Sequence, residues 1–76
     1  MNIEEIKRIY NEKNKVSFKI FGLDYTIEKI NSSVIIYANM YEKKYKIYTN
    51  IDDLLNYYFI YGEELITYNN KIQNIH

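Results

Sequence analysis

The spacing of hydrophobic residues changes along the chain and predicts a helix followed by strands. Ile3, Ile6 and Tyr10 recur at the spacing of one helix face, which predicts a helix over about residues 3–13. Over residues 16–20 apolar and polar side chains alternate, as in a strand with one buried face. The period of the pattern therefore falls from about 3.6 residues to about 2.

Three short turns divide the next segment into an antiparallel meander. Gly22-Leu23 and Asn31-Ser32 suit two-residue hairpin loops, and Glu42-Lys43 is taken as the third turn. These turns predict three apolar cross-strand pairs on one common face: Ile20 with Tyr25, Ile27 with Ile36, and Ala38 with Ile47. Because a slip of one residue would turn every side chain to the other face, this agreement supports the register.

Helical signals return after the strands. Asn50 followed by two aspartates is typical of an N-cap and an acidic first turn, and predicts a helix over about residues 51–58. A last helix is predicted from apolar residues at helical spacing after Gly62: Leu65, Tyr68, Ile72 and Ile75. We expect the backbone to fray beyond Asn74.

These elements predict one α+β domain over residues 1–76. Its two layers are a four-stranded antiparallel meander and the helices that cover one face, in the order α-β-β-β-β-α-α. The chain has no cysteine, so hydrophobic packing has to hold the fold without disulfide bonds. The lack of cysteine favours the cytoplasm, and no apolar run approaches the roughly 18 residues that cross a bilayer, so we expect no membrane association.

Composition and charge argue against some classes of function. Ten basic side chains balance ten acidic ones, which argues against both a general nucleic-acid binder and an acidic DNA mimic. Ile, Asn, Tyr and Lys make up 43 of 76 positions. Codons for all four begin with two A or T bases, so this usage indicates an AT-rich genome. Abundant tyrosine is therefore not by itself a sign of function.

Residues suited to catalysis are scarce. There is no cysteine, and the only histidine is His76, so neither a Ser–His nor a Cys–His pair is expected. The acidic pairs Asp52-Asp53 and Glu63-Glu64 stand where helix N-termini favour negative charge. We therefore expect a protein that is not an enzyme and that binds no cofactor or metal.

The sheet face turned away from the helices is the main candidate for function. The predicted register places Tyr37 opposite Tyr48 on this face, among apolar side chains and lysines. A run over residues 57–61 is also notable, because one helix cannot bury five consecutive side chains on one face. The candidate partner-binding residues are Phe21, Ile35, Tyr37, Tyr41, Lys44, Lys46, Tyr48, Tyr58 and Tyr61.

Several interpretations of these residues remain open. Tyrosine is favoured in interface cores, so the first partner to consider is another protein. Tyrosine and lysine on an open sheet also suit weak binding of single-stranded nucleic acid, although the neutral net charge makes this partner the less favoured one. A structural homodimer is the third interpretation, and ordinary sheet surface is the fourth, since tyrosine is a good strand former.

Three stretches carry a resemblance to known proteins: Phe21-Gly22 leading into Tyr25-Thr26-Ile27, then Ile51–Asn56, then Ile60–Leu65. Through them the chain resembles small uncharacterised α+β proteins of low-GC Gram-positive bacteria and their phages and mobile elements. Its organisation is also similar to that of some phage anti-CRISPR inhibitors. This resemblance implies a small inhibitor or regulator that acts by steric occlusion of another protein, and it carries over no functional residue.

Overall fold

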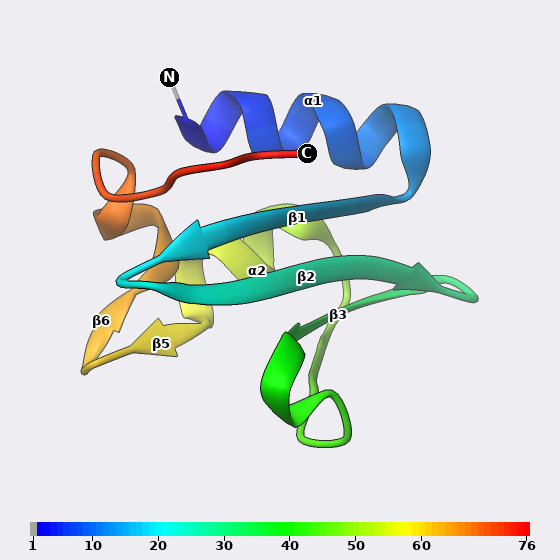
Figure 1. Ribbon diagram of the computed structural model, residues 1–76. Coiled ribbons are helices and arrows are strands. Elements are labelled where there is room, and N and C mark those ends of the chain that lie inside the picture. The colour runs from blue at the N-terminus through cyan, green and yellow to red at the C-terminus, as the bar shows by residue number, and fades with distance from the viewer. Residues whose placement is uncertain (1) are drawn as a thin grey trace.

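The computed structural model describes residues 2–76 and shows a helix, a meander and a second helix in two layers (Figure 1). The elements follow in this order: α1 (Asn2–Lys13), β1 (Lys15–Ile20), β2 (Leu23–Ile30), β3 (Ser33–Ala38), the 3-10 turn η1 (Asn39–Tyr41), β4 (Lys46–Tyr48), α2 (Ile51–Tyr57), β5 (Phe59–Ile60), β6 (Glu63–Glu64) and the 3-10 turn η2 (Leu65–Tyr68). The predicted α+β class and the four-stranded antiparallel meander are confirmed.

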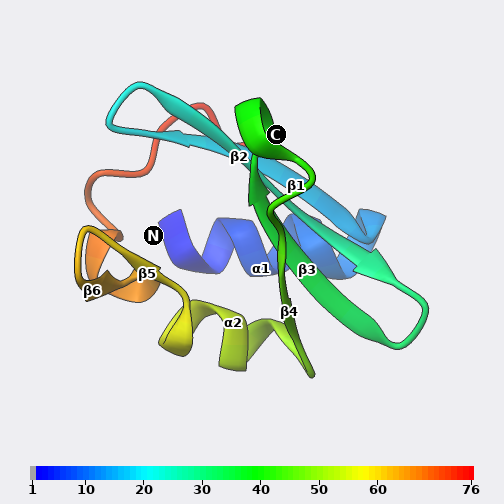
Figure 2. The same ribbon diagram turned by 90° about the horizontal axis from the view of Figure 1, so that it is seen from below.

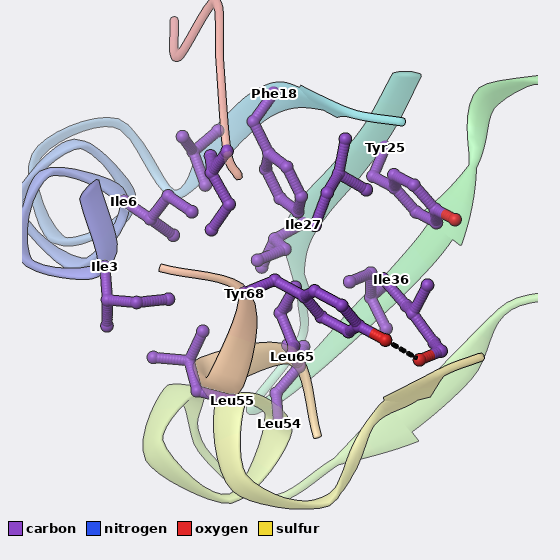
Figure 3. Packing of buried hydrophobic residues seen from close by; sticks show 14 of the residues in the cluster. Ile3, Ile6, Phe18, Tyr25, Ile27, Ile36, Leu54, Leu55, Leu65 and Tyr68 are labelled. Atoms are coloured by element: carbon purple, nitrogen blue, oxygen red, sulfur yellow. Dashed lines mark hydrogen bonds between the residues drawn. The ribbon is translucent and has the colours of Figure 1, made fainter. Parts of the chain in front are cut away.

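The two helices cover the same face of the sheet (Figure 2). One apolar cluster joins Ile6 of α1, Phe18 of β1, Ile36 of β3 and Leu54 of α2, all of them fully buried. Leu65 of η2 completes the cluster between the helices, as the close view shows (Figure 3). We call the covered side the inner face and the opposite side the outer face.

The register of the first hairpins follows from their two-residue loops. The predicted pairing of Ile27 with Ile36 is confirmed. In the first hairpin Ile20 pairs with Leu23 rather than with Tyr25, because the loop is Phe21-Gly22 and not the predicted Gly22-Leu23. This correction shifts the register by two residues, so every side chain keeps its predicted face.

The third hairpin differs from the prediction in a way that does change faces. Strand β3 ends at Ala38, and η1 with a following loop replaces the expected tight turn at Glu42-Lys43. As a result Ile47 pairs with Ile35 instead of with Ala38. The shift is an odd number of residues, so Ile47 lies on the outer face and Tyr48 on the inner face. Both had been assigned to the opposite faces.

The predicted last helix is wrong, although its apolar residues are buried as expected. A hairpin of β5 and β6 turns at Tyr61-Gly62, where both residues have positive φ (51° and 82°). The helix was predicted to begin after Gly62, but Glu63–Glu64 extend as β6 and only Leu65–Tyr68 are helical, in the 3-10 turn η2. Leu65 and Ile72 nevertheless reach the core, because the spacing suits a 3-10 turn followed by an extended segment equally well.

The C-terminal segment pairs with β1 instead of fraying, so that prediction is also wrong. Backbone hydrogen bonds join Lys19 to Gln73 (2.7 and 2.8 Å) and Ser17 to His76 (2.8 and 3.4 Å), and Figure 1 shows the segment running beside β1. Two residues, Asn74 and Ile75, lie between these pairs where β1 has only one, which makes a β-bulge. Over residues 2–76 no helix is long and apolar enough to span a membrane.

Candidate binding surface

The outer face has a polar part next to β1 and β2. Thr26, only 3% exposed, donates a hydrogen bond from its hydroxyl to Asn39 Oδ1 (2.7 Å), and its oxygen lies 3.0 Å from the Ser17 hydroxyl. Since the one Thr26 proton is given to Asn39, Ser17 is the donor of the second bond. These bonds hold η1, which begins at Asn39, over this end of the face.

Tyr37 is half-buried in the same region and is not an open stacking surface. Its hydroxyl donates a hydrogen bond to Glu28 Oε1 (3.1 Å) from the neighbouring strand. Burial, and then the adjacent Glu28 carboxylate, raise the pKa of Tyr37 above its ordinary value. Tyr37 therefore serves as a cross-strand contact of the sheet.

The other part of the outer face, towards β4, is hollowed and lined by both apolar and polar residues. A depression of about 370 Å³ is lined there by seven residues: Ile30, Asn31, Ser32, Ser33, Ile35, Tyr45 and Ile47. Ile35 is only 9% exposed yet lies outside the core cluster. Ile30, Tyr45 and Ile47 remain 42%, 48% and 60% exposed. We call this depression the outer hollow.

Strand β4 bounds the outer hollow and is an edge of the sheet, because no other strand among residues 2–76 pairs with it beyond β3. In a two-residue hairpin the residues flanking the loop form a hydrogen-bonded pair, and such pairs alternate along the ladder. Ile30 and Ser33 flank the second loop, so Val34 and Ile36 direct their backbone groups to β4. Ile47, opposite Ile35, consequently directs its N–H and C=O towards the open edge.

Three lysines stand beside this edge without an acidic partner. Lys43, Lys44 and Lys46 make no ion pair within the described chain, whose ion pairs all lie at α1 and at the Lys19–Asp24 pair. The 3-10 turn η1, which precedes the loop that leads into β4, exposes Met40 and Tyr41, at 72% and 58%. Lys44 Nζ lies 5.9 Å from the centre of the Tyr41 ring. This edge therefore combines apolar side chains with unpaired positive charge.

Three predicted partner-binding residues lie on the core side instead: Tyr48, Tyr58 and Lys46, of which Lys46 pairs with Ile36 and stays exposed. Tyr48, opposite Val34, packs against the core cluster, and its hydroxyl donates a hydrogen bond to the Tyr57 carbonyl (3.4 Å). Tyr58 also packs against the cluster, with its ring edge-on to that of Tyr25 at 6.5 Å. The predicted pairing of Tyr37 with Tyr48 on the outer face is wrong, because the β3–β4 register turns Tyr48 inward.

Phe21 and Tyr61 come together from two separate hairpin loops. They are 51% and 75% exposed, and their ring centres lie 5.7 Å apart. Each precedes a glycine and has a positive φ, 50° and 51°. Phe21 also meets the Tyr68 ring edge-on at 5.4 Å, so its ring closes one end of the core.

Sequence reasoning missed three exposed apolar residues that line the outer hollow, Ile30, Tyr45 and Ile47, and the exposed Met40 of η1. Ile47 was assigned to the core by the incorrect third turn. The available signal was the cluster of lysines at residues 43–46, since lysines are typical of exposed edge strands. An edge strand with an outward apolar residue is tolerated when the strand is short, as β4 is.

No three side chains of His, Asp or Glu within residues 2–76 lie in an arrangement that could hold a metal ion. No protein-family model matches the chain, and no curated protein or solved structure is significantly similar to it.

Proposed function

We propose that the chain is a protein-binding module without a catalytic role, and that its binding surface is the outer hollow together with the β4 edge. One observation carries this proposal. The fold leaves Ile30, Tyr45 and Ile47 exposed around a buried Ile35, outside the core cluster and next to unpaired sheet backbone. Neighbouring apolar side chains that stay exposed are typical of interaction sites, which supports this proposal.

The chemistry of the surface favours a protein over a nucleic acid. Bases stack on aromatic rings, whereas three of the four apolar side chains in the outer hollow are isoleucines. Tyr48, which was expected to stack bases together with Tyr37 on the outer face, faces inward, and Tyr37 is hydrogen-bonded to Glu28. Aliphatic side chains around a depression instead suit the apolar core of a protein interface.

The molecule is large enough to offer one standard protein interface. The accessible surface of the molecule is 5006 Å², and a standard interface covers about 800 Å² on each side. Such an interface would cover roughly a sixth of the molecule. A contact of that size centred on β4 would extend over the exposed Met40 and Tyr41. We propose that the chain acts by covering its partner, as a phage or mobile-element inhibitor or regulator would.

A photocrosslinking amino acid at position 45 tests this proposal in cells that naturally carry the gene. Tyr45 borders the outer hollow, whereas Glu12 is exposed on α1 and provides the control position. We expect a discrete protein adduct from position 45 and none from position 12. The adduct should disappear when Ile47→Lys is added, because a charge in the hollow would have to be desolvated on binding.

Three results would contradict the proposal. They are the absence of any adduct at position 45, an adduct that persists with Ile47→Lys, and an adduct that ribonuclease or deoxyribonuclease removes. A melting curve of Ile47→Lys, matched to that of the unchanged protein, shows that loss of the adduct reflects binding and not unfolding.

A further inference from the structure

The β4 edge has a second property besides its apolar hollow, namely positive charge that nothing in the described chain neutralises. Lys43, Lys44 and Lys46 lie within one short stretch, with Glu42 as the only acid there. By contrast, Lys7, Arg8 and Lys19 each pair with a carboxylate at 2.8 to 3.8 Å. Lys13, Lys15, Lys29 and Lys71 also make no ion pair within residues 2–76, but none of them belongs to β4 or to the loop before it.

We propose that the partner binds as an extended, acidic segment that adds a strand to β4. This inference rests on the proposed function and specifies the chemistry of the partner. Unpaired backbone at a sheet edge accepts a further strand through main-chain hydrogen bonds, while alternate side chains supply specificity. Charge complementarity with the lysines then selects an acidic segment over a neutral or basic one.

The register of β4 defines the pattern of the incoming strand. A residue opposite Ile47 points to the outer face and lies beside the outer hollow, so it is apolar. Its neighbours point to the other side of the sheet, where Lys46 is exposed, so an acidic residue stands there. The segment therefore has an apolar residue with Asp or Glu next to it on the Lys46 side.

A second copy of the chain fits this edge less well. Pairing two β4 strands would bring two sets of three lysines to one interface, and lysines on an edge strand act against such self-pairing. Each β4 strand offers only three residues to a ladder, so few backbone bonds would offset the repulsion. An acidic segment instead gains from the same charges.

Selection from a library of short random displayed peptides tests the inference. The bait is the whole protein, and the same selection is run on Ile47→Lys, on a triple variant with Lys43, Lys44 and Lys46 changed to Glu, and on a control triple variant. The control changes Lys13, Lys15 and Lys71 to Glu, which alters the net charge equally at exposed positions away from β4. Binding of the enriched peptides is measured by fluorescence anisotropy at physiological salt.

The enriched peptides should be acidic, with an apolar residue next to an acid. Their affinity should fall about tenfold or more in the Lys43/Lys44/Lys46 variant and less than about threefold in the control. Amide resonances of residues 45–48 should shift on titration with the best peptide. The Lys43/Lys44/Lys46 variant should in turn select basic peptides, which shows directly that these charges set the preference.

Enrichment of neutral or basic peptides by the unchanged protein would overturn the inference. A selection that enriches no peptide would overturn it too, and so would peptide binding that the Ile47→Lys variant retains. Binding of an oligothymidylate at residues 45–48 in physiological salt would assign the edge to nucleic acid instead. Self-association in sedimentation that Ile47→Lys abolishes would assign it to a second copy. If crosslinking at Tyr45 succeeds while the selected peptides are neutral, the proposed function stands and only the acidic partner is wrong.

Discussion

The hydroxyl of Tyr68 stabilises the segment after β5, which has no regular α-helix. Its side chain is buried beside Leu65, and its hydroxyl donates a hydrogen bond of 2.6 Å to the Ile60 carbonyl (Figure 3). This bond ties η2 to β5 across the turn at Tyr61-Gly62. A tyrosine at this position was expected in the core, but its polar contact could not be predicted without the correct turn.

Tyr68→Phe should lower the free energy of unfolding by about 0.5 to 1.5 kcal/mol, because one buried hydrogen bond is lost while the Ile60 carbonyl keeps its partner in the β5–β6 hairpin. Urea denaturation followed by circular dichroism measures the change. Tyr57→Phe is the matched control, since Tyr57 is 65% exposed, and its effect should stay within about 0.5 kcal/mol. Equal effects of the two substitutions would show that the Tyr68 bond contributes nothing.

The first turn shows why residue preferences place a loop only approximately. Glycine was expected at the first central position of the loop, since it adopts positive φ most easily. In the structure Phe21 occupies that position at φ 50° and Gly22 the second at φ 79°. An aromatic residue rarely adopts this conformation. The contacts of Phe21 with Tyr61 and Tyr68 stabilise it, and those contacts were invisible in the sequence.

At the scale of elements, α1, α2 and the first three strands followed from hydrophobic spacing and caps. Asn50, predicted to cap α2, accepts a hydrogen bond at Oδ1 from the Asp53 N–H (2.8 Å). The prediction of the β3–β4 connection was wrong because this part of the sequence has no residues typical of a tight turn. The helix predicted for the last segment was wrong because an apolar residue at every third or fourth position suits both a helix and an irregular chain that returns to the core.

The C-terminal segment is the element whose role the sequence least suggested. It covers the edge of β1 through backbone hydrogen bonds at Ser17 and Lys19. Removal of residues 73–76 should cost about 2 to 4 kcal/mol, at roughly 1 kcal/mol for each of the four bonds. Hydrogen exchange at the amides of Ser17 and Lys19 should accelerate, and urea denaturation gives the loss of stability.

A shortened chain with unchanged stability, and with the two amides still protected, would refute this role for the segment. Ile75→Ala provides a milder comparison. It keeps the backbone bonds and removes one partly buried side chain, so it should leave both amides protected while lowering stability.

At the scale of the whole molecule, tyrosines that are buried or partly buried lower the stability of the fold at alkaline pH. Burial raises the pKa of Tyr25 and Tyr58, and the tyrosines near each of them add to the shift. Below about pH 10, the ordinary value, the phenols are protonated in the folded and unfolded chains alike, and stability is at its full value. Above it the unfolded chain releases protons first, so the free energy of unfolding falls as pH rises through the raised pKa values.

Urea denaturation at several pH values should therefore give constant stability between about pH 8 and pH 9.5 and a decline above about pH 10. Absorbance of tyrosinate, followed on the folded protein, should show some phenols that titrate later than exposed ones. The double variant Tyr25→Phe/Tyr58→Phe should flatten the decline. A decline of equal slope in that variant would contradict the assignment to these two tyrosines.

The proposed binding surface depends on the placement of two neighbouring residues in β4. Ile47 lies on the outer face and is 60% exposed, whereas Tyr48 packs against the core cluster. The outer hollow exists as a binding surface only if the fold does not need Ile47. The sequence alone suggested the reverse placement, since the predicted register turned Ile47 inward and Tyr48 outward.

The most direct test compares the free energies of unfolding of Ile47→Lys and Tyr48→Lys by urea denaturation. We predict that Ile47→Lys changes stability by no more than about 0.5 kcal/mol, as at other exposed positions, and that Tyr48→Lys lowers it by about 2 kcal/mol or more. If Ile47→Lys proves the more destabilising of the two, Ile47 belongs to the core and the outer hollow is not a free surface.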